Sequence, residues 1–247
     1  MLRRRRSWHD PEPSGWRRAL RGLLTAAVGI GIPLALFFVM GPAITPRPGP
    51  QPPPPELGRA AVEDPAGELG GSWTLDPEAS WVGYRIQEEL PRLRDLFDAV
   101  GRTDEVAGAL EVSGAKVTAG WVEADLFQLE SDSERRDRAI QVRYLESEQY
   151  PDARFELSER VGLLDTPEPG VPVEVPVVGE LTLRETTRTV RPRLRARWDG
   201  ERIRVVGALD VTLADYDIRA PRLPGFRNVE DEGVIEINLT FRPDAPD

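Results

Sequence analysis

The densest group of residues that could carry out chemistry lies near the C-terminus, where three carboxylates surround one tyrosine. Asp210, Asp215 and Asp217 precede Arg219 and flank Tyr216. Two carboxylates held close together can act as general acid and base, or they can bind a hard cation such as Ca²⁺. The same residues also fit a solvated turn in which aspartate pairs with arginine, and we favour that simpler interpretation.

Three arginines could bind an anionic ligand. Arg85, Arg184 and Arg188 fall in segments with a strand-like pattern. Guanidinium groups bind phosphate through paired N–H donors, so these residues could meet a phosphate head group at the mouth of a pocket. An arginine on a strand can also simply face solvent. A fourth arginine, in the pair Arg136-Asp137, fits an ion pair at the start of a helix or a cap on the end of a barrel.

The residue types that the chain lacks exclude several kinds of chemistry. There are no cysteines, and the single histidine is His9, near the N-terminus. Disulfides, thiol catalysis and cysteine-zinc sites are therefore excluded, and the commonest general base and metal ligand is missing from the rest of the chain. The sequence has no nucleophile elbow and no phosphate-binding loop. We predict no catalytic residue, no metal site and no enzyme activity.

Charge is unevenly distributed along the chain. Residues 1–71 hold nine arginines against six acidic residues, a balance of +3. Because the whole chain carries −10, residues 72–247 carry −13. Nucleic-acid-binding proteins neutralise phosphates with clustered Lys and Arg, so this acidic body predicts no nucleic-acid partner.

An uncharged segment near the N-terminus predicts a membrane-spanning helix. Residues 22–46 contain no charged residue, and a helix of this length would extend about 37 Å, enough to cross a hydrocarbon core of ~30 Å. Seven arginines precede the segment and only Arg47 and Arg59 follow it closely. The positive-inside rule therefore predicts a cytoplasmic N-terminus. A cleaved signal peptide is the alternative, although Gly41-Pro42-Ala43 is a poor cleavage site.

We therefore expect four parts in a single-pass protein of the cytoplasmic membrane. A cytoplasmic basic tail (1–21) and a transmembrane helix (22–44) precede a Pro-rich linker (45–71) and an extracytoplasmic β domain (72–243). Residues 42–55 contain eight prolines. Proline favours extended polyproline backbone, so the linker is predicted to be a semi-rigid spacer that holds the body away from the membrane.

The body has the pattern of an antiparallel β protein. From Trp73 onward, short segments alternate apolar and polar residues, which is the period of a strand with one buried face. The longest run is 203–213, and Asp199-Gly200 before it predicts a hairpin turn. About eight such segments favour an antiparallel barrel or sandwich. Residues 133–147 indicate one helix, and residues 90–98 a second, short one.

Motifs in the body resemble those of the YceI-like family, whose members are also called polyisoprenoid-binding or lipocalin-like proteins. No single motif is specific, but their order and spacing are, and the resemblance covers about 71–243. In chain order the motifs are Gly101-Arg102-Thr103, Val106-Ala107-Gly108, Ala124-Asp125-Leu126, Leu129-Glu130-Ser131-Asp132, Arg136-Asp137, Tyr150-Pro151-Asp152-Ala153-Arg154-Phe155, Gly179-Glu180-Leu181-Thr182-Leu183, Thr186-Thr187-Arg188 and Asp215-Tyr216-Asp217-Ile218.

The resemblance implies an eight-stranded antiparallel lipocalin-like barrel with an elongated apolar tunnel, exported to the cell envelope. It also implies an isoprenoid ligand, such as a polyprenyl lipid or a quinone, and no other cofactor. Each buried methylene contributes ~0.8 kcal/mol, so a prenyl chain needs length and dryness rather than polar groups. Small residues at Gly108, Ala124, Gly179 and Gly207 could leave room for such a chain.

Two functions follow, and the sequence does not decide the oligomeric state in either. The first is a membrane-anchored, non-catalytic binding protein for a lipophilic isoprenoid. The second is a cell-envelope interaction module with a solid barrel and no ligand. For the first function, the predicted tunnel-lining residues are Val82, Tyr84, Ile86, Leu110, Val122, Ala124, Leu126, Phe155, Leu157, Gly179, Leu181, Leu183, Val205, Gly207, Leu209, Val211, Ile237 and Leu239.

Overall fold

The computed structural model describes residues 51–60, 62, 67–90, 95–163, 167–219, 222–223 and 227–244. The predicted cytoplasmic tail and transmembrane helix lie outside these residues, so both stay predictions. Within the described ranges, no helix has the length and apolar character needed to cross a membrane.

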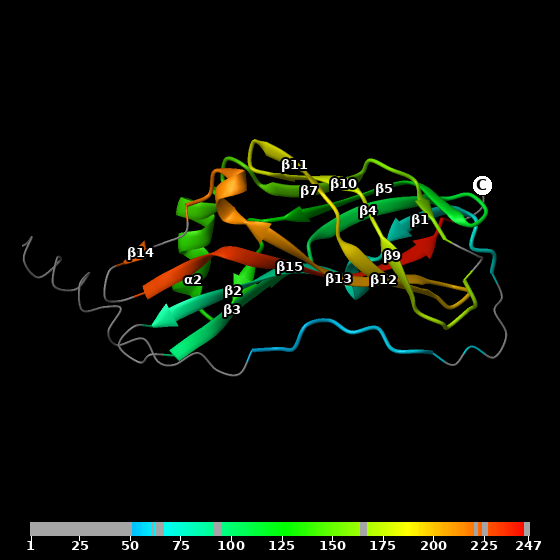
Figure 1. Cartoon of the computed structure of the whole chain (residues 1–247), viewed down its shortest axis with the longest axis horizontal. Coiled ribbons are helices and arrows are strands. Elements are labelled where there is room, and N and C mark those ends of the chain that lie inside the picture. Colours follow the sequence, from blue (N-terminus) through cyan, green and yellow to red (C-terminus); the bar gives the residue numbers. More distant parts are fainter. Residues whose placement is uncertain are drawn as a thin grey trace, which may run out of the picture. The chain divides into compact units, whose positions relative to one another are not determined.

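One antiparallel sheet of 15 strands forms the body (Figure 1). Its main path runs β11-β10-β7-β5-β4-β1-β15-β13-β12-β9. The strands are β1 (Gly71–Leu75), β2 (Trp81–Leu90), β3 (Asp95–Thr103), β4 (Val106–Val112), β5 (Lys116–Asp125), β6 (Glu130–Ser131), β7 (Asp152–Leu157), β8 (Val161–Gly162), β9 (Val173–Pro176), β10 (Gly179–Leu183), β11 (Thr186–Val190), β12 (Arg193–Trp198), β13 (Ile203–Thr212), β14 (Arg222–Leu223) and β15 (Arg227–Pro243).

The predicted barrel of eight strands is wrong in its count and in its closure. Within the described ranges the sheet has 15 strands, and it exceeds eight even without β6, β8 and β14, which are two-residue pairings too short for an alternating pattern. Its main path also stays open, since β11 and β9 are its ends. The mainly antiparallel architecture and the hairpin at Asp199-Gly200, between β12 and β13, are confirmed.

Two short connections curl this open sheet until its ends meet. β9 and β10 lie near opposite ends of the path, yet only Val177–Val178 joins them. Arg191–Pro192 likewise joins β11 to β12. The amide of Val177 donates to the carbonyl of Pro192 at 3.0 Å, which ties the two connections together. The boundary between β10–β11 and β12–β13 is joined by these chain crossings and not by a strand ladder. We call this boundary the seam (Figure 1).

The inner face of the curled sheet carries the hydrophobic core. One cluster joins Trp73 and Val106 to Ile203 and Phe241, which come from strands on both sides of the curl. A second cluster lies beneath β10 and β13, and a third packs β7 against β9. The core therefore fills the space between the two halves of a single sheet.

Helical structure is confirmed at one of its two predicted positions. Residues 133–147 contain α2 (Glu134–Ala139) and a π-helical turn, η3 (Ile140–Tyr144). The Ser133 hydroxyl caps α2 by accepting the Arg136 amide at 3.4 Å. The predicted helix at 90–98 is wrong, because β2 continues to Leu90 and β3 begins at Asp95. Ladder hydrogen bonds between β2 and β3 override the local helical spacing. The remaining helical turns are η2 (Pro77–Ala79) and η4 (Leu213–Tyr216).

Residues 51–60, which we call the strap, lie extended against the outer face of the sheet (Figure 1). Proline-rich backbone has no internal hydrogen bonds, so its carbonyls can accept from other groups. Arginines of three strands donate to four of them. The pairs are Arg85 to Pro52 (2.7 Å), Arg102 to Pro53 (3.5 Å), Arg195 to Leu57 (2.9 Å) and Arg197 to Gly58 (2.5 Å).

The strap also covers apolar surface. Leu57 is 2% exposed, although its neighbours in the strap are largely exposed. Val206 of β13 is equally buried and lies outside the three core clusters, as expected for a residue that alternates with inward-facing Val205. The linker at 45–71 was predicted as a semi-rigid spacer that holds the body away from the membrane. Its described residues 51–60 instead pack along the sheet.

Truncating the buried strap residue should weaken the fold. Leu57→Ala removes a fully buried side chain, so we expect the free energy of unfolding to fall by about 2–3 kcal/mol. Urea denaturation of the full-length chain measures this change. The matched control is Glu56→Ala at the exposed neighbouring position, with an expected change below about 0.5 kcal/mol. Equal effects of the two substitutions would contradict a docked strap.

Candidate ligand-binding site

Three strands form a continuous apolar wall on the inner face. Directly paired residues of neighbouring strands point to the same side of a sheet. Leu209 of β13 pairs with Ile235 of β15, which pairs with Tyr84 of β2. The next row joins Gly207, Ile237 and Val82, and a further row joins Val211, Gly233 and Ile86.

Parts of this inner wall are more accessible than buried positions on the outer face of the same strands. Val205, Leu209 and Ile237 point inward but are only half-buried. On the same strands, outward-facing Val206 and Glu236 are 2% and 1% exposed. A sheet with one solvated face normally buries its apolar side and exposes its polar side. Apolar surface that stays accessible in this way is typical of a ligand groove.

Most predicted lining residues lie in the core clusters. Val82, Leu110, Val122, Ala124, Val205, Ile237 and Leu239 belong to the first cluster, Leu181, Leu183, Leu209 and Val211 to the second, Leu157 to the third and Phe155 to both of the last two. Among the others, Leu126 is buried, and Tyr84 and Ile86 are half-buried. The structure therefore gathers them on one face, while their contact with a ligand stays a prediction.

The glycines do not leave the open space that their size suggested. A Cβ on Gly179 would meet the Phe155 ring at 2.2 Å, and one on Gly207 would meet Leu194 at 2.4 Å. At Gly108 the nearest atom is the Trp121 carbonyl oxygen, at 2.7 Å. These positions are glycine because neighbouring side chains or backbone lie directly over them. Space for a ligand would therefore have to lie along the half-buried apolar wall and not at these glycines.

A polar cluster lies at the α2 end of the inner face. Arg136 of α2 is 8% exposed, and its guanidinium pairs with the buried Glu88 at 3.4 Å and with Asp132. The Ser131 hydroxyl also accepts from this guanidinium, at 3.1 Å. Burial raises the pKa of neighbouring Tyr84 well above its ordinary value, so its hydroxyl stays protonated at neutral pH. The helix therefore caps this end with a compensated charge, as predicted for Arg136.

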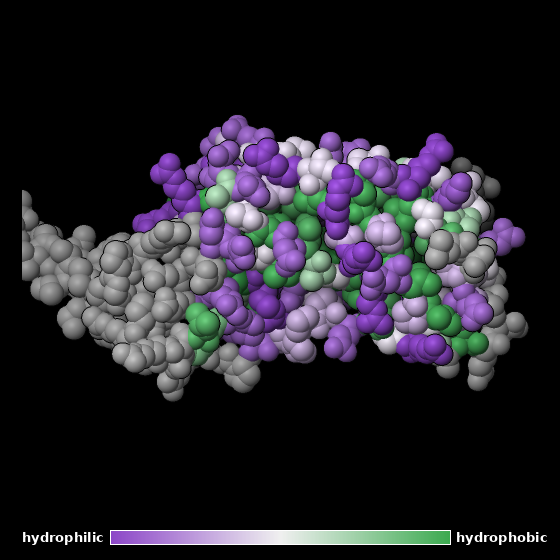
Figure 2. All heavy atoms as spheres, in the orientation of Figure 1, coloured by the Kyte–Doolittle hydropathy of each residue, from purple (hydrophilic) through white to green (hydrophobic). Residues whose placement is uncertain are grey.

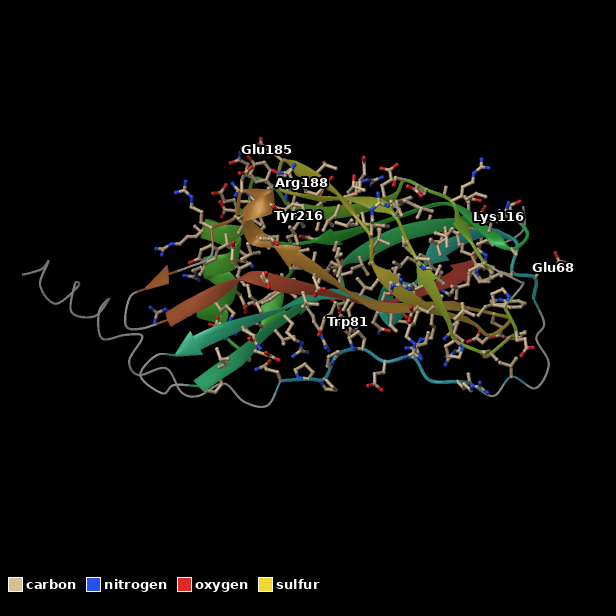
Figure 3. All side chains as sticks on the ribbon, in the orientation of Figure 1. Glu68, Trp81, Lys116, Glu185, Arg188 and Tyr216 are labelled. Carbon is tan, nitrogen blue, oxygen red and sulfur yellow. The ribbon has the colours of Figure 1, made fainter. Side chains whose placement is uncertain are left out.

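A pocket of about 620 Å³ lies on the seam. It is lined by residues 188–193 of β11 and its crossing, 208–212 of β13, and Asp215 and Tyr216 of η4. Figure 2 shows hydrophobic residues reaching the surface in a band across this face, between hydrophilic residues on either side. Figure 3 shows Arg188 and Tyr216 close together at the η4 end of the sheet.

The aspartates around Tyr216 form a turn rather than a metal site. Asp217 has a left-handed backbone (φ 57°), and its carbonyl accepts from Arg184 at 3.1 Å. The Asp215 carbonyl accepts from Arg188 at 3.0 Å. Across the described ranges, no group of His, Asp or Glu residues could hold a metal ion. Burial, with a contribution from the Asp215 charge, raises the pKa of Tyr216.

The three arginines proposed for a head group are not together. Arg85 lies on the outer face, where it pairs with Glu236 at 2.7 Å and Asp98 at 3.0 Å. Arg184 sits in the β10–β11 turn and pairs with Glu146 at 2.7 Å. Only Arg188 lines the seam pocket.

Sequence reasoning missed two residues of the site. Ile235 completes the inner wall and was recognised as part of a strand, but it was not included among the lining residues. Tyr216 was recognised only as the centre of a charged turn, yet it is 2% exposed and packs in the second core cluster. The alternation of Ile235 with Ile237 would have placed the former on the same face. No local signal would have placed Tyr216.

An antiparallel sheet curled around an apolar core defines the class of β proteins in which one sheet packs against itself. Residues 73–241 match the model of the YceI-like domain. The chain therefore belongs to the YceI-like family, as its motifs indicated. Comparison with curated protein sequences gives no significant match.

Solved structures support the same fold. A polyisoprenoid binding domain from Saccharophagus degradans, implicated in plant cell wall breakdown, aligns with a TM-score of 0.56 at 17% identity, covering 69% of this chain and 98% of that one. BcnA from Burkholderia cenocepacia aligns with a TM-score of 0.53 at 16% identity, covering 67% and 98%. Identities this low establish the fold alone.

Removing the buried arginine of the polar cluster should destabilise the fold. Arg136→Met removes a guanidinium that pairs with the buried Glu88 carboxylate at 3.4 Å, so we expect the free energy of unfolding to fall by about 3 kcal/mol. The double variant Arg136→Met/Glu88→Gln should recover most of the loss. Arg135→Met, at the exposed neighbouring position, is the control. Chemical denaturation of all four chains tests this, and a double variant as unstable as the single one would refute the pairing.

Proposed function

We propose that this protein is a membrane-anchored, extracytoplasmic and non-catalytic binding protein for a lipophilic isoprenoid of the polyprenyl or quinone type. The half-buried apolar wall of β13, β15 and β2 carries the proposal. A prenyl chain laid along this wall would cover surface that the protein leaves accessible, at ~0.8 kcal/mol per buried methylene. The Saccharophagus degradans relative is itself described as a polyisoprenoid binding domain.

The strap supports a position close to the membrane. Gln51, its first residue, donates to Asp132 at 3.0 Å, beside α2. Six residues separate Gln51 from the end of the predicted transmembrane helix at residue 44, a reach of at most about 25 Å. The α2 end would therefore stay near the bilayer that supplies the lipid. Two exposed apolar residues at that end, Phe127 and Val142, fit such a surface.

Native mass spectrometry of the full-length chain, purified from membranes in mild detergent, tests the proposal. We expect a bound species whose mass fits a polyprenyl lipid or an isoprenoid quinone. A chain that carries no such lipid, together with an interior that tolerates no added volume, would instead favour an interaction module with a solid core.

A bulky substitution on the inner wall separates these outcomes. Ile235→Trp should reduce the co-purifying lipid at least tenfold, because the indole occupies the ligand's space. If the interior is hollow, the free energy of unfolding should change by less than about 1 kcal/mol, whereas a packed interior would lose 1–3 kcal/mol or more. Ala119→Trp, at an exposed position of β5, is the control and should retain the lipid.

A further inference from the structure

The hydroxyl of Tyr216 has no hydrogen-bond partner among the described residues, although it is buried. Leaving a buried hydroxyl unpaired costs free energy, and a phenylalanine would fill the same apolar space without this cost. Tyr216 also lines the seam pocket. The hydroxyl therefore belongs to a residue of the pocket lining and has an unused hydrogen-bonding capacity.

Arg188 holds a guanidinium at the same pocket (Figure 3). Its Nε donates to the Asp215 carbonyl at 3.0 Å, which fixes the group against η4. This bond uses one of five guanidinium donors, so both terminal nitrogens can still donate to a ligand. The other two arginines of the pocket lie beside carboxylates, since Arg193 pairs with Glu174 at 3.2 Å and Arg191 lies 4.0 Å from Glu159.

The pocket also carries two carboxylates, Asp210 and Asp215. Both are exposed, so solvent screens their charges. Asp210 alternates with Leu209 and Val211, which places its side chain on the outer side of β13. Arg188 is exposed as well, so solvent screens its charge too, and binding of an anion depends on the hydrogen bonds that its guanidinium can donate.

The seam pocket is continuous with the apolar wall. Leu209 and Val211 line the pocket and also pack in the second core cluster, to which Tyr216 belongs. A chain lying along the wall would thus bring its polar end to the seam, between Tyr216 and Arg188. Such a ligand is amphipathic, with a prenyl tail inside and an anionic head at the opening.

We propose that the seam pocket binds the phosphate head group of a prenyl phosphate, with Arg188 and Tyr216 donating hydrogen bonds to its oxygens. This inference rests on the proposed function and narrows it to ligands with an anionic head. The charged guanidinium supplies most of the preference for phosphate, because charge-assisted hydrogen bonds are the stronger kind. The tyrosine hydroxyl adds a neutral donor at the buried side.

Binding of farnesyl phosphate and farnesol to the full-length chain in amphipol tests this inference. The two probes share one tail, so their difference reports the head group. We expect the wild-type chain to bind farnesyl phosphate at least tenfold more tightly than farnesol. Arg188→Gln should remove this preference, and Tyr216→Phe should reduce it several-fold, each measured as the ratio of the two affinities within one variant. Partition into amphipol is the same for every variant and cancels in the comparison.

Two controls separate binding from folding. Arg202→Gln changes an exposed arginine of the β12–β13 turn and should leave both affinities unchanged. The thermal midpoint of the ligand-free Tyr216→Phe chain should be equal to or above that of the wild type, whereas a hydroxyl with a structural role would lower it. Equal binding of farnesol and farnesyl phosphate by all chains would overturn this inference and leave the proposed function standing. Binding of neither probe would overturn both.

Discussion

Two crossings of two residues each, Val177–Val178 and Arg191–Pro192, join the parts of the sheet that no strand ladder connects. Connections this short leave the chain no choice but to bring the ends of the sheet together. The two crossings also separate β11 from β13, which are not joined by hydrogen bonds of a strand ladder. The seam pocket lies between these two strands. The curl, the enclosed core and the seam pocket all depend on this constraint.

Coverage of the two faces is the second organising feature. The strap lies along the outer face of the sheet and accepts hydrogen bonds from arginines of β2, β3 and β12. Val206 and Glu236 are buried on the same face. Arginines are suited to this task, since their rigid donor groups reach the carbonyls of a proline-rich segment that has no hydrogen bonds of its own. The inner wall meanwhile stays half-buried. Stability thus comes partly from the outside of the sheet, which leaves the inside available for a ligand.

The polar groups of the interior stand at its margins rather than along its length. Arg136 and Glu88 occupy the α2 end, and Tyr216 and Arg188 occupy the seam, with apolar rows between them. This arrangement suits binding of a long apolar chain with one polar end. The aspartates near Tyr216 stabilise a turn through their backbone carbonyls.

The sequence by itself determined many of the strands, the helix after Ser133, the hairpin at Asp199-Gly200 and the family, because alternation, capping and turn chemistry depend on residues close together in the chain. It misassigned 90–98, where pairing with β2 outweighs local spacing. Only the tertiary structure decided that the strap is docked, that Phe155 covers Gly179 and that Tyr216 faces the seam. These features depend on which strands become neighbours, and strand order brings together residues that are far apart in the sequence.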